Sequence, residues 1–175
     1  ADWKKELEPH YAEAERMLGS TENPGLYDAD DTLKAVAEGF GKGETFEATG
    51  VAVFFGEPEE EVADPYFGGE GPRRSGCNFC GSCMTGCRYN AKNTLVKNYL
   101  YFAERNGVDI CPEATVRHIR ALPPGQDDGA RYEIVYRQST GWFGVRKQRV
   151  RARNVVLAAG VLGTLDILFR SRDEA

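Results

Sequence analysis

Four of the five cysteines lie in one short segment, and their spacing suits the binding of an iron-sulfur cluster. Cys77, Cys80, Cys83 and Cys87 are separated by two, two and three residues. Thiolates this close together can wrap around a cluster, and the two glycines between them leave room for backbone amides to approach the sulfides. We therefore predict these four cysteines as the ligands of an iron-sulfur cluster.

Other interpretations of this segment stay open from spacing alone. Zinc usually takes two separated pairs of ligands, so a single loop suits it less well. The thiols could also be buried structural groups, or form disulfides in an exported protein. The match to a bacterial ferredoxin run is incomplete, because Arg88 rather than proline follows Cys87 and no second run exists. Cys111, which precedes Pro112, is the reserve ligand.

An apolar run that ends in small residues is the second feature that could form a ligand-binding site. Residues 155–159 are Val-Val-Leu-Ala-Ala, Gly160 follows, and a helix is expected over residues 163–170. We expect the run to be a strand buried on both faces. Its small residues would let a ligand approach, and the helix start would offer amides to a phosphate. Close helix packing explains the same pattern, and the Gly-x-Gly-x-x-Gly turn of dinucleotide sites is absent from the sequence.

Helices predicted from apolar periodicity would position these residues. In residues 3–18 apolar side chains recur every three or four positions, and Gly19 is a stop signal. A second stripe predicts a helix over residues 31–40, with an aspartate as its N-cap. A third helix is expected over residues 93–105, before the Asn-Gly pair that ends it.

Short extended segments account for much of the remaining chain. Residues 50–55 and 114–122 are expected to be extended, and residues 132–138 and 145–151 alternate as two half-buried antiparallel strands. Residues 63–76 are rich in Gly, Pro and Arg without periodicity, which predicts a loop. The mixture of helices and strands indicates an α+β or α/β fold.

Composition and charge narrow the class of protein. No apolar run approaches the roughly 18 residues of a transmembrane helix. Residues 1–72 carry 18 acidic and 5 basic side chains, whereas residues 73–175 carry 9 acidic and 17 basic ones. This break indicates two pieces with different roles. Nucleic-acid binding is not expected, because no recognised motif accompanies the basic residues.

The ends of the chain predict that it is an internal piece of a longer protein. It begins at Ala1 without an initiator methionine or signal sequence, and it stops at Ala175 after an apolar segment. We therefore expect catalytic residues outside it. Neither His10 nor His118 is predicted as a catalytic base, because each suits an ordinary surface or packing position.

Three segments resemble the glucose-methanol-choline (GMC) family of FAD-dependent oxidoreductases, especially its bacterial cholesterol-oxidase-like branch. These segments are residues 77–107, 114–119 and 154–171. Two runs carry the resemblance: residues 86–94 read Gly-Cys-Arg-Tyr-Asn-Ala-Lys-Asn-Thr, and residues 154–160 read Asn-Val-Val-Leu-Ala-Ala-Gly. The first run is similar to the family's return from its substrate domain to its FAD domain. The second is similar to a late strand and helix of the FAD domain, and the resemblance is looser before Cys77.

The resemblance implies a fragment of an FAD-binding Rossmann-like domain, with a helix, a β-meander and a buried strand, joined to part of a substrate domain. Residues 1–76 would belong to the substrate-binding domain, residues 77–111 would form a cysteine-rich loop and helix, and residues 112–175 would belong to the FAD-binding domain. The backbone of Val116 would face the adenine of FAD, and Ala159 and Gly160 would lie beside the cofactor. No catalytic residue is assigned within the chain.

The implied activity is oxidation of the CH-OH group of an alcohol, with a sterol as one candidate, by hydride transfer to FAD. Oxygen or another carrier would accept the electrons. Some bacterial dehydrogenases of this family pass electrons through a cluster in a cysteine-rich loop, which agrees with the iron-sulfur interpretation. The competing class is an iron-sulfur electron-transfer module, and the third is a structural thiol or zinc knot. Clustered thiols favour a reducing cytoplasm, although the sequence does not fix the compartment.

Overall fold

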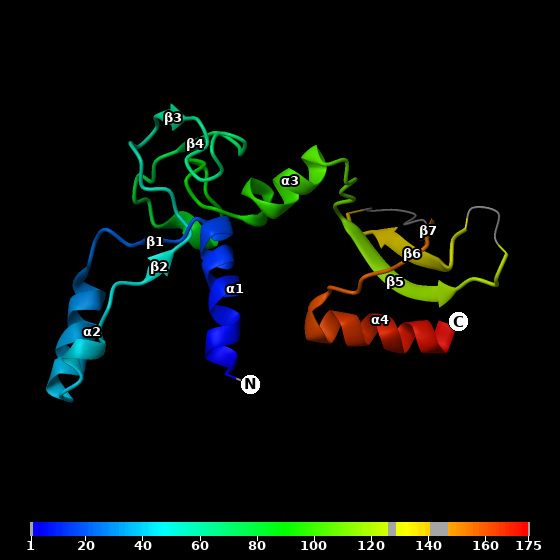
Figure 1. Ribbon diagram of the computed structural model, residues 1–175, viewed down its shortest axis with the longest axis horizontal. Helices are drawn as coiled ribbons and strands as arrows, with labels where there is room; N and C mark the ends of the chain where they lie inside the picture. The colour runs from blue at the N-terminus through cyan, green and yellow to red at the C-terminus, as the bar shows by residue number, and fades with distance from the viewer. Residues whose placement is uncertain (1, 126–128, 141–146, 175) are drawn as a thin grey trace. The chain divides into compact units, whose positions relative to one another are not determined.

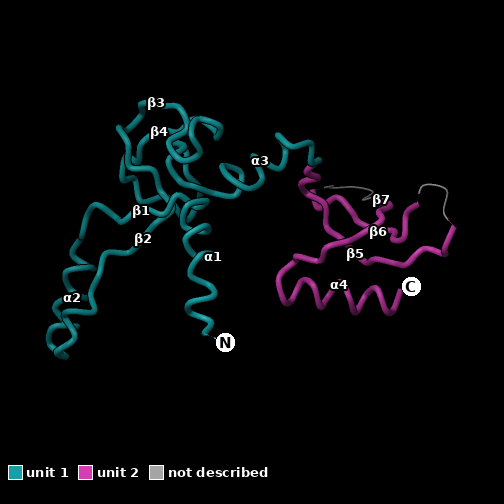
Figure 2. The backbone as a smooth tube through the Cα atoms, in the orientation of Figure 1, with its two compact units in different colours: residues 1–109 teal, residues 110–175 magenta. Residues whose placement is uncertain are grey.

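The computed structural model describes residues 2–125, 129–140 and 147–174, and its chain forms two compact units (Figure 1, Figure 2). Unit 1 is Ala1–Asp109 and unit 2 is Ile110–Ala175. The described residues form a mixed α+β structure with four α-helices and small antiparallel sheets. No helix in these ranges is long and apolar enough to cross a bilayer.

Unit 1 consists of helices, 3-10 turns and two-residue strands joined by long irregular segments. Its α-helices are α1 (Trp3–Leu18), α2 (Asp28–Gly39) and α3 (Tyr99–Arg105). Its 3-10 turns are η1 (Gly43–Thr45), η2 (Ser82–Met84) and η3 (Leu95–Lys97). Its strands are β1 (Thr21–Glu22) paired with β2 (Gly50–Val51), and β3 (Glu61–Val62) paired with β4 (Arg74–Ser75). The predicted strand over residues 50–55 is thus confirmed only at its start.

Helix α1 has the predicted bounds. The Asp2 carboxylate accepts a hydrogen bond from the Lys5 N–H at 3.5 Å, which caps the first turn. Gly19 ends the helix with φ of 58°, a left-handed conformation that glycine adopts without a steric penalty. The predicted apolar stripe is mostly not buried, since Trp3 is 67% exposed and Met17 is the one buried residue of this helix.

The other two predicted helices of unit 1 have different bounds. Helix α2 begins at Asp28, three residues early, and its capping carboxylate is that of Asp30, which accepts from the Tyr27 N–H at 2.9 Å. The helix predicted over residues 93–105 is interrupted at Asn98, where φ is −136° and ψ is −100°. The side-chain oxygen of the buried Asn98 accepts a hydrogen bond from the Tyr99 N–H, so Asn98 is the N-cap of α3.

Buried polar side chains connect the end of α1 to the segment after the cysteines. Asn98 Nδ2 donates to the Met17 carbonyl at 3.0 Å, and Asn93 Nδ2 donates to the Gly19 carbonyl at 3.3 Å. Both asparagines are buried, so these bonds are shielded from water. They fix α1 against residues that follow it by more than seventy positions.

Unit 2 is a three-stranded meander covered on one side by a helix. Its strands β5 (Ala114–Ala121), β6 (Tyr132–Gln138) and β7 (Lys147–Ala152) pair in sequence order, all antiparallel. Helix α4 (Gly160–Glu174) packs on β5, where the Ile119 N–H donates to Ser171 Oγ at 2.9 Å. The predicted meander is confirmed, except that residues 145–146 lie outside the described residues.

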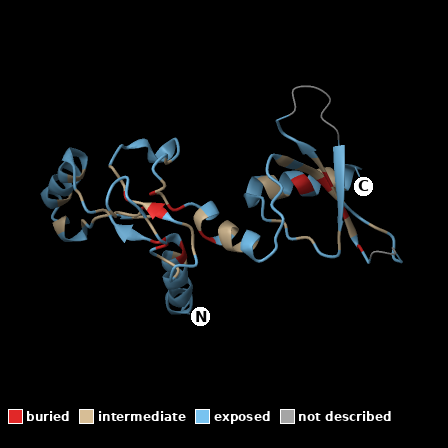
Figure 3. Ribbon diagram, turned by 90° about the horizontal axis from the view of Figure 1, so that it is seen from above, coloured by how far each residue is buried: buried red, intermediate tan, exposed pale blue. Residues whose placement is uncertain are grey.

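The prediction of a buried strand over residues 155–159 is wrong. None of these residues pairs with a described strand, and none of them is in the buried class, which Figure 3 draws in red. Val156 is 88% exposed. A strand needs a partner for its backbone groups, and an apolar sequence alone does not supply one. Helix α4 also begins at Gly160 rather than at residue 163.

Candidate functional site

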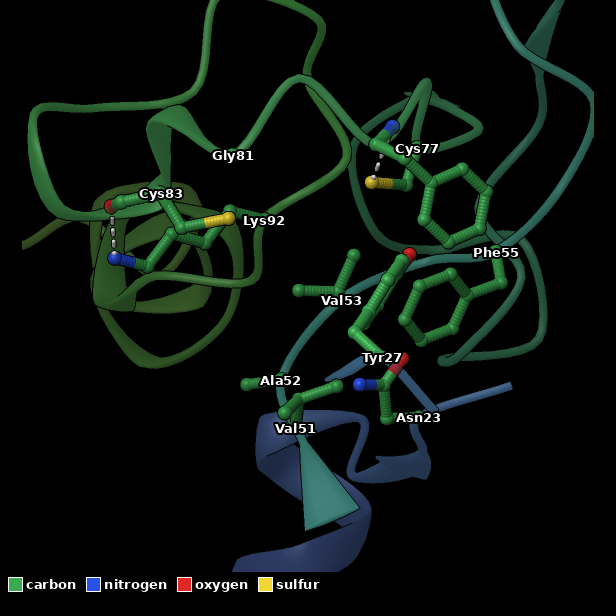
Figure 4. Close-up of a pocket in the computed structure, with 11 residues that line it drawn as sticks. Asn23, Tyr27, Val51, Ala52, Val53, Phe55, Cys77, Gly81, Cys83 and Lys92 are labelled. Atoms are coloured by element: carbon green, nitrogen blue, oxygen red, sulfur yellow. Dashed lines mark hydrogen bonds between the residues drawn. The ribbon is translucent and has the colours of Figure 1, made fainter. Parts of the chain in front are cut away.

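An apolar cavity of about 450 Å³ opens in unit 1 beside the cysteine segment (Figure 4). Its walls come from stretches that are far apart in sequence, near residues 23–27, 51–55 and 77–92. The lining residues are Asn23, Tyr27, Val51, Ala52, Val53, Phe55, Cys77, Phe79, Gly81, Cys83 and Lys92. A cavity of this volume with few polar groups is typical of a small-molecule site.

Aromatic rings and one lysine shape the cavity wall. The rings of Phe55 and Phe79 are stacked, with centroids 5.7 Å apart and planes 21° from parallel. Lys92 Nζ donates to the Cys83 carbonyl at 2.7 Å, the bond drawn at the left of Figure 4. The ammonium group therefore holds the cysteine segment in place, and the aromatic and aliphatic groups suit a flat apolar ligand.

Backbone hydrogen bonds bring these walls together. The Phe54 N–H donates to the Ala91 carbonyl and the Asn93 N–H donates to the Ala52 carbonyl, each at 2.8 Å. The Cys77 N–H donates to the Phe54 carbonyl at 2.9 Å. The segment 52–54 is thereby bonded to both arms of the chain that flank the cysteines.

The four clustered cysteines line a second, much smaller cavity of about 20 Å³. Cys77 and Cys83 line both cavities. Cys77 and Cys87 are half-buried, Cys80 and Cys83 are exposed, and all four are free thiols. The fold therefore gathers around one small space the four residues that the sequence singled out.

The described structure does not support a metal centre at these thiols. Within the ranges that the structure describes, no three His, Cys, Asp or Glu side chains are placed to hold a metal ion. The Phe79 N–H donates to Cys77 Sγ at 3.3 Å, whereas backbone amides of residues 89–92 favour the charged form of the Cys87 thiol, so these two thiols interact with different backbone groups. The iron-sulfur prediction is not supported for Cys77, Cys80, Cys83 and Cys87. The reserve ligand, Cys111, is exposed in unit 2.

Cys87 lies in an environment that favours its thiolate. Burial by itself raises the pKa of the Cys87 thiol, because it disfavours the charged form. The backbone amides of residues 89–92 favour the charged form and together outweigh burial, so the pKa of Cys87 lies below its ordinary value.

A buried arginine fixes the segment that follows the cysteines. Arg74 is 1% exposed, and its guanidinium donates to the Asn90 carbonyl at 2.9 Å, to the Ala91 carbonyl at 2.8 Å and to Asn93 Oδ1. Its Cζ lies 5.7 Å from the centre of the Tyr66 ring. Burial lowers the pKa of Arg74. One side chain thus sets the path of the backbone that leaves the cysteine segment.

The Asp64 carboxylate orders the glycine-rich loop before the cysteines. It accepts hydrogen bonds from the backbone N–H groups of Tyr66 at 3.0 Å, Phe67 at 2.7 Å, Gly69 at 3.2 Å and Gly71 at 3.1 Å. The loop predicted over residues 63–76 is confirmed, apart from the two-residue strand β4 at its end.

Unit 2 contains the residues predicted to lie beside a cofactor. Val116 is half-buried on β5, where the register with β6 shifts between Val116 and His118. Ala159 and Gly160 are exposed, and Gly160 has φ of 70° with open space where a Cβ would stand. These small residues leave the backbone at the start of α4 accessible. Their role beside a cofactor stays a prediction.

Both histidines occupy the ordinary positions that were expected. His10 is exposed on α1. His118 is buried on β5, and its Nδ1 lies 2.9 Å from Glu174 Oε2 on α4. The apolar cavity and the roles of Asp64 and Arg74 were not predicted from the sequence. The adjacent aromatic residues Phe54 and Phe55 could have indicated an apolar site, whereas no local sequence pattern indicates that an arginine in a loop is buried.

Comparison with known proteins shows the family. The model of the family described as GMC oxidoreductase matches residues 72–172. A protein named cholesterol oxidase from Acinetobacter baumannii is 49% identical over 174 residues, covering 97% of this chain and 31% of that protein. A protein of the same name from Mycobacterium tuberculosis (strain H37Rv) is 46% identical over 177 residues, covering 98% of this chain and 30% of that protein. The chain thus spans about a third of the length of these curated relatives. No solved structure matches it significantly.

Proposed function

The chain belongs to the GMC oxidoreductase family, and from this premise we propose that it is part of an FAD-dependent enzyme that oxidises the CH-OH group of an alcohol. The observation that carries the proposal is the family match over residues 72–172, which includes the cysteine segment, the meander and most of α4. FAD would supply the acceptor for the hydride that leaves the alcohol carbon.

We further propose a sterol or a similarly bulky apolar alcohol as the substrate class. The relatives that cover nearly the whole chain at 46–49% identity are named cholesterol oxidase. The apolar cavity of unit 1 supports this class, because its volume of about 450 Å³ and its aromatic wall fit a fused ring system better than a small polar alcohol. In this proposal Val53, Phe55 and Phe79 exclude water from the apolar part of the substrate.

The residues of unit 2 fit a cofactor site. Ala159 and Gly160 are exposed, and no side chain or backbone atom crowds the Cβ position of Gly160. The N-terminal amides of α4 follow at once, and such amides favour negatively charged groups. We propose that Ala159 and Gly160 let FAD approach the backbone, and that the backbone of Val116 faces its adenine. None of these residues is proposed to move a proton.

The proposed domain assignment gives the two ends of the chain different roles. Residues 1–76 would belong to a substrate-binding domain, residues 77–111 would form the connecting loop and helix, and residues 112–175 would belong to a Rossmann-like FAD-binding domain. The meander and α4 of unit 2 support the last assignment. Oxygen is the proposed electron acceptor, with another carrier as the alternative. No observation favours an iron-sulfur electron-transfer module.

The test is a spectrum and a turnover assay on the full-length protein. The oxidised protein should show the two visible bands of a flavin, and denaturation should release FAD. Addition of a sterol should bleach these bands without oxygen and release hydrogen peroxide with oxygen, whereas the same sterol with its hydroxyl esterified should do neither. A protein without flavin would refute the cofactor. A flavoprotein that reduces its flavin only with small alcohols would refute the sterol proposal and leave the FAD proposal standing.

A further inference from the structure

Phe79 combines a strained backbone with an exposed aromatic ring at the wall of the apolar cavity. Its φ is 58°, in the left-handed region that suits glycine and that bulky side chains rarely adopt. The other described residues in this region that are not glycine are Glu59, Asn90 and Glu113, and none of them is aromatic. The fold therefore keeps a phenylalanine where a glycine would be free of strain.

Hydrogen bonds hold the turn that contains Phe79. The Phe79 N–H donates to Cys77 Sγ at 3.3 Å, which closes the turn locally. The Cys77 N–H donates to the Phe54 carbonyl at 2.9 Å, which joins the turn to the segment that contains Phe55. These bonds bring Phe79 beside Phe55 although the two residues are distant in sequence.

Burial does not explain why the strained residue is an aromatic one. Phe79 is 54% exposed, whereas a ring that stabilises an apolar core is mostly removed from water. Its ring is stacked on that of the half-buried Phe55, with centroids 5.7 Å apart and planes 21° from parallel. Phe55 thus supports the Phe79 ring, and much of that ring stays accessible to other groups. Backbone strain of this kind is found at active sites and ligand clamps.

The Phe79 ring lines a cavity whose other walls are also apolar or aromatic. It shares the cavity of about 450 Å³ with Tyr27, Val53 and Phe55, three of the residues labelled in Figure 4. Tyr27 is the N-cap residue of α2, so it contributes a ring from a distant part of the chain. A flat apolar ligand can stack on an aromatic ring over its whole width, whereas a flexible chain covers only part of it.

We propose that Phe79 is a specificity-determining residue, whose ring stacks on the fused rings of the alcohol and favours ring alcohols over open-chain ones. The left-handed backbone places the ring in the cavity wall, and Phe55 keeps its plane in position. Phe79 moves no proton and acts on binding alone. The identity of the ligand rests on the proposed function, but stacking is measured by binding without any turnover.

The experiment measures the binding of two probes to the full-length protein by equilibrium dialysis. The probes are dehydroepiandrosterone, a soluble steroid alcohol, and dodecanol, an open-chain alcohol. Phe79→Leu keeps an apolar side chain and removes the flat ring, so steroid affinity should fall about tenfold and dodecanol affinity should change less than about twofold. The matched control is Phe40→Leu, at a ring of unit 1 that is 80% exposed and is not among the residues lining this cavity. It should leave both affinities unchanged.

Phe79→Tyr distinguishes stacking from a structural role. It keeps a flat ring at the same backbone position, so steroid affinity should stay within about twofold of the native value. If Phe79 were only structural, Phe79→Leu would lower both affinities together, because a loosened wall affects every ligand of the cavity.

A measurement on the native protein needs no variant and stays decisive if a substituted protein fails to fold. Hydroxyl radicals label exposed aromatic rings, and both Phe79 and Phe40 are exposed. Saturating dehydroepiandrosterone should reduce the labelling of Phe79 at least about threefold, because a bound ligand covers the ring, and should leave that of Phe40 unchanged.

The proposal is overturned if the native protein does not bind the steroid, if Phe79→Leu leaves steroid affinity unchanged, if it weakens both probes equally, or if bound steroid does not protect Phe79 from labelling. The proposed function is tested separately by flavin reduction. If Phe79 behaves as expected but no alcohol reduces the flavin, the proposed function fails and the role of Phe79 stands. If sterols reduce the flavin while Phe79→Leu binds steroid as the native protein does, only the role of Phe79 fails.

Discussion

Replacing the buried Arg74 by methionine is the sharpest test of how the cysteine segment is held. The substitution keeps an apolar chain of similar length and removes the guanidinium. The Asn90 carbonyl and the Asn93 side-chain oxygen then lose their donor, and the Ala91 carbonyl loses one of its two donors. We expect the segment that follows the cysteines to open much more often than in the native protein.

The magnitude follows from the burial of these acceptors. An acceptor withdrawn from water without a partner costs about 1–3 kcal/mol, so the Asn90 carbonyl and the Asn93 side-chain oxygen cost roughly 2–6 kcal/mol together. The Ala91 carbonyl keeps its hydrogen bond from the Phe54 N–H. Removal of a desolvated charge offsets part of this cost, and we expect a net loss of about 3 kcal/mol. This value corresponds to a roughly 100-fold increase in the opened population.

The assay is amide hydrogen exchange in the full-length protein, followed in peptides that cover residues 89–98. Exchange in these peptides should accelerate about 100-fold in Arg74→Met, because the Asn93 N–H bond to Ala52 depends on this segment. The control is Arg73→Met, which removes an exposed ion pair between Arg73 Nε and Glu61 Oε2 at 2.9 Å. An exposed pair is worth less than about 1 kcal/mol, so exchange should hardly change. Equal exchange in the two variants would show that the burial of Arg74 does not organise the segment.

Three further predictions concern close packing, the cofactor and the thiol. Gly76→Ala should destabilise the protein by about 3 kcal/mol, because the added methyl would overlap the Gly56 carbonyl, whereas Gly39→Ala has open space and should change stability by less than about 1 kcal/mol; equal urea midpoints for the two variants would contradict this. Ala159→Phe should reduce the FAD that survives dialysis about tenfold without lowering Tm, and unchanged retention would remove Ala159 from the cofactor site. Alkylation of Cys87 as a function of pH should have its midpoint below that of the same thiol in the unfolded protein, because backbone amides stabilise the thiolate; a midpoint at or above the unfolded value would contradict the assigned environment.

Much of the local structure could be predicted because it depends on residues near in sequence. The stripe of residues 3–18 and the glycine after it specify α1, and alternation specifies β6 and β7. The helix predicted over residues 93–105 was wrong in its first part because of one side chain: Asn98 is buried and donates to the carbonyl of Met17, which lies on another helix. That contact interrupts the predicted helix although its apolar pattern continues.

The candidate site was predicted only in part. The four cysteines were recognised by type and spacing, and they do share one cavity. Their spacing could not show where each sulfur points, which depends on the backbone amides that the loop turns toward it. The apolar cavity needs Phe55 and Phe79, which are brought together by bonds between distant segments.

The sequence by itself determined the family resemblance, the helix ahead of Gly19, the meander and the gathering of four thiols in one loop. All of these rest on residue types and on neighbours within a few positions. The tertiary structure decided which groups are buried and what they bond. It placed the Arg74 charge among neutral oxygens, left residues 155–159 without a partner among the described strands, and set the Cys87 thiol where backbone amides favour its charged form. The physical reason is that burial, strand pairing and thiolate stability depend on partners supplied from elsewhere in the chain.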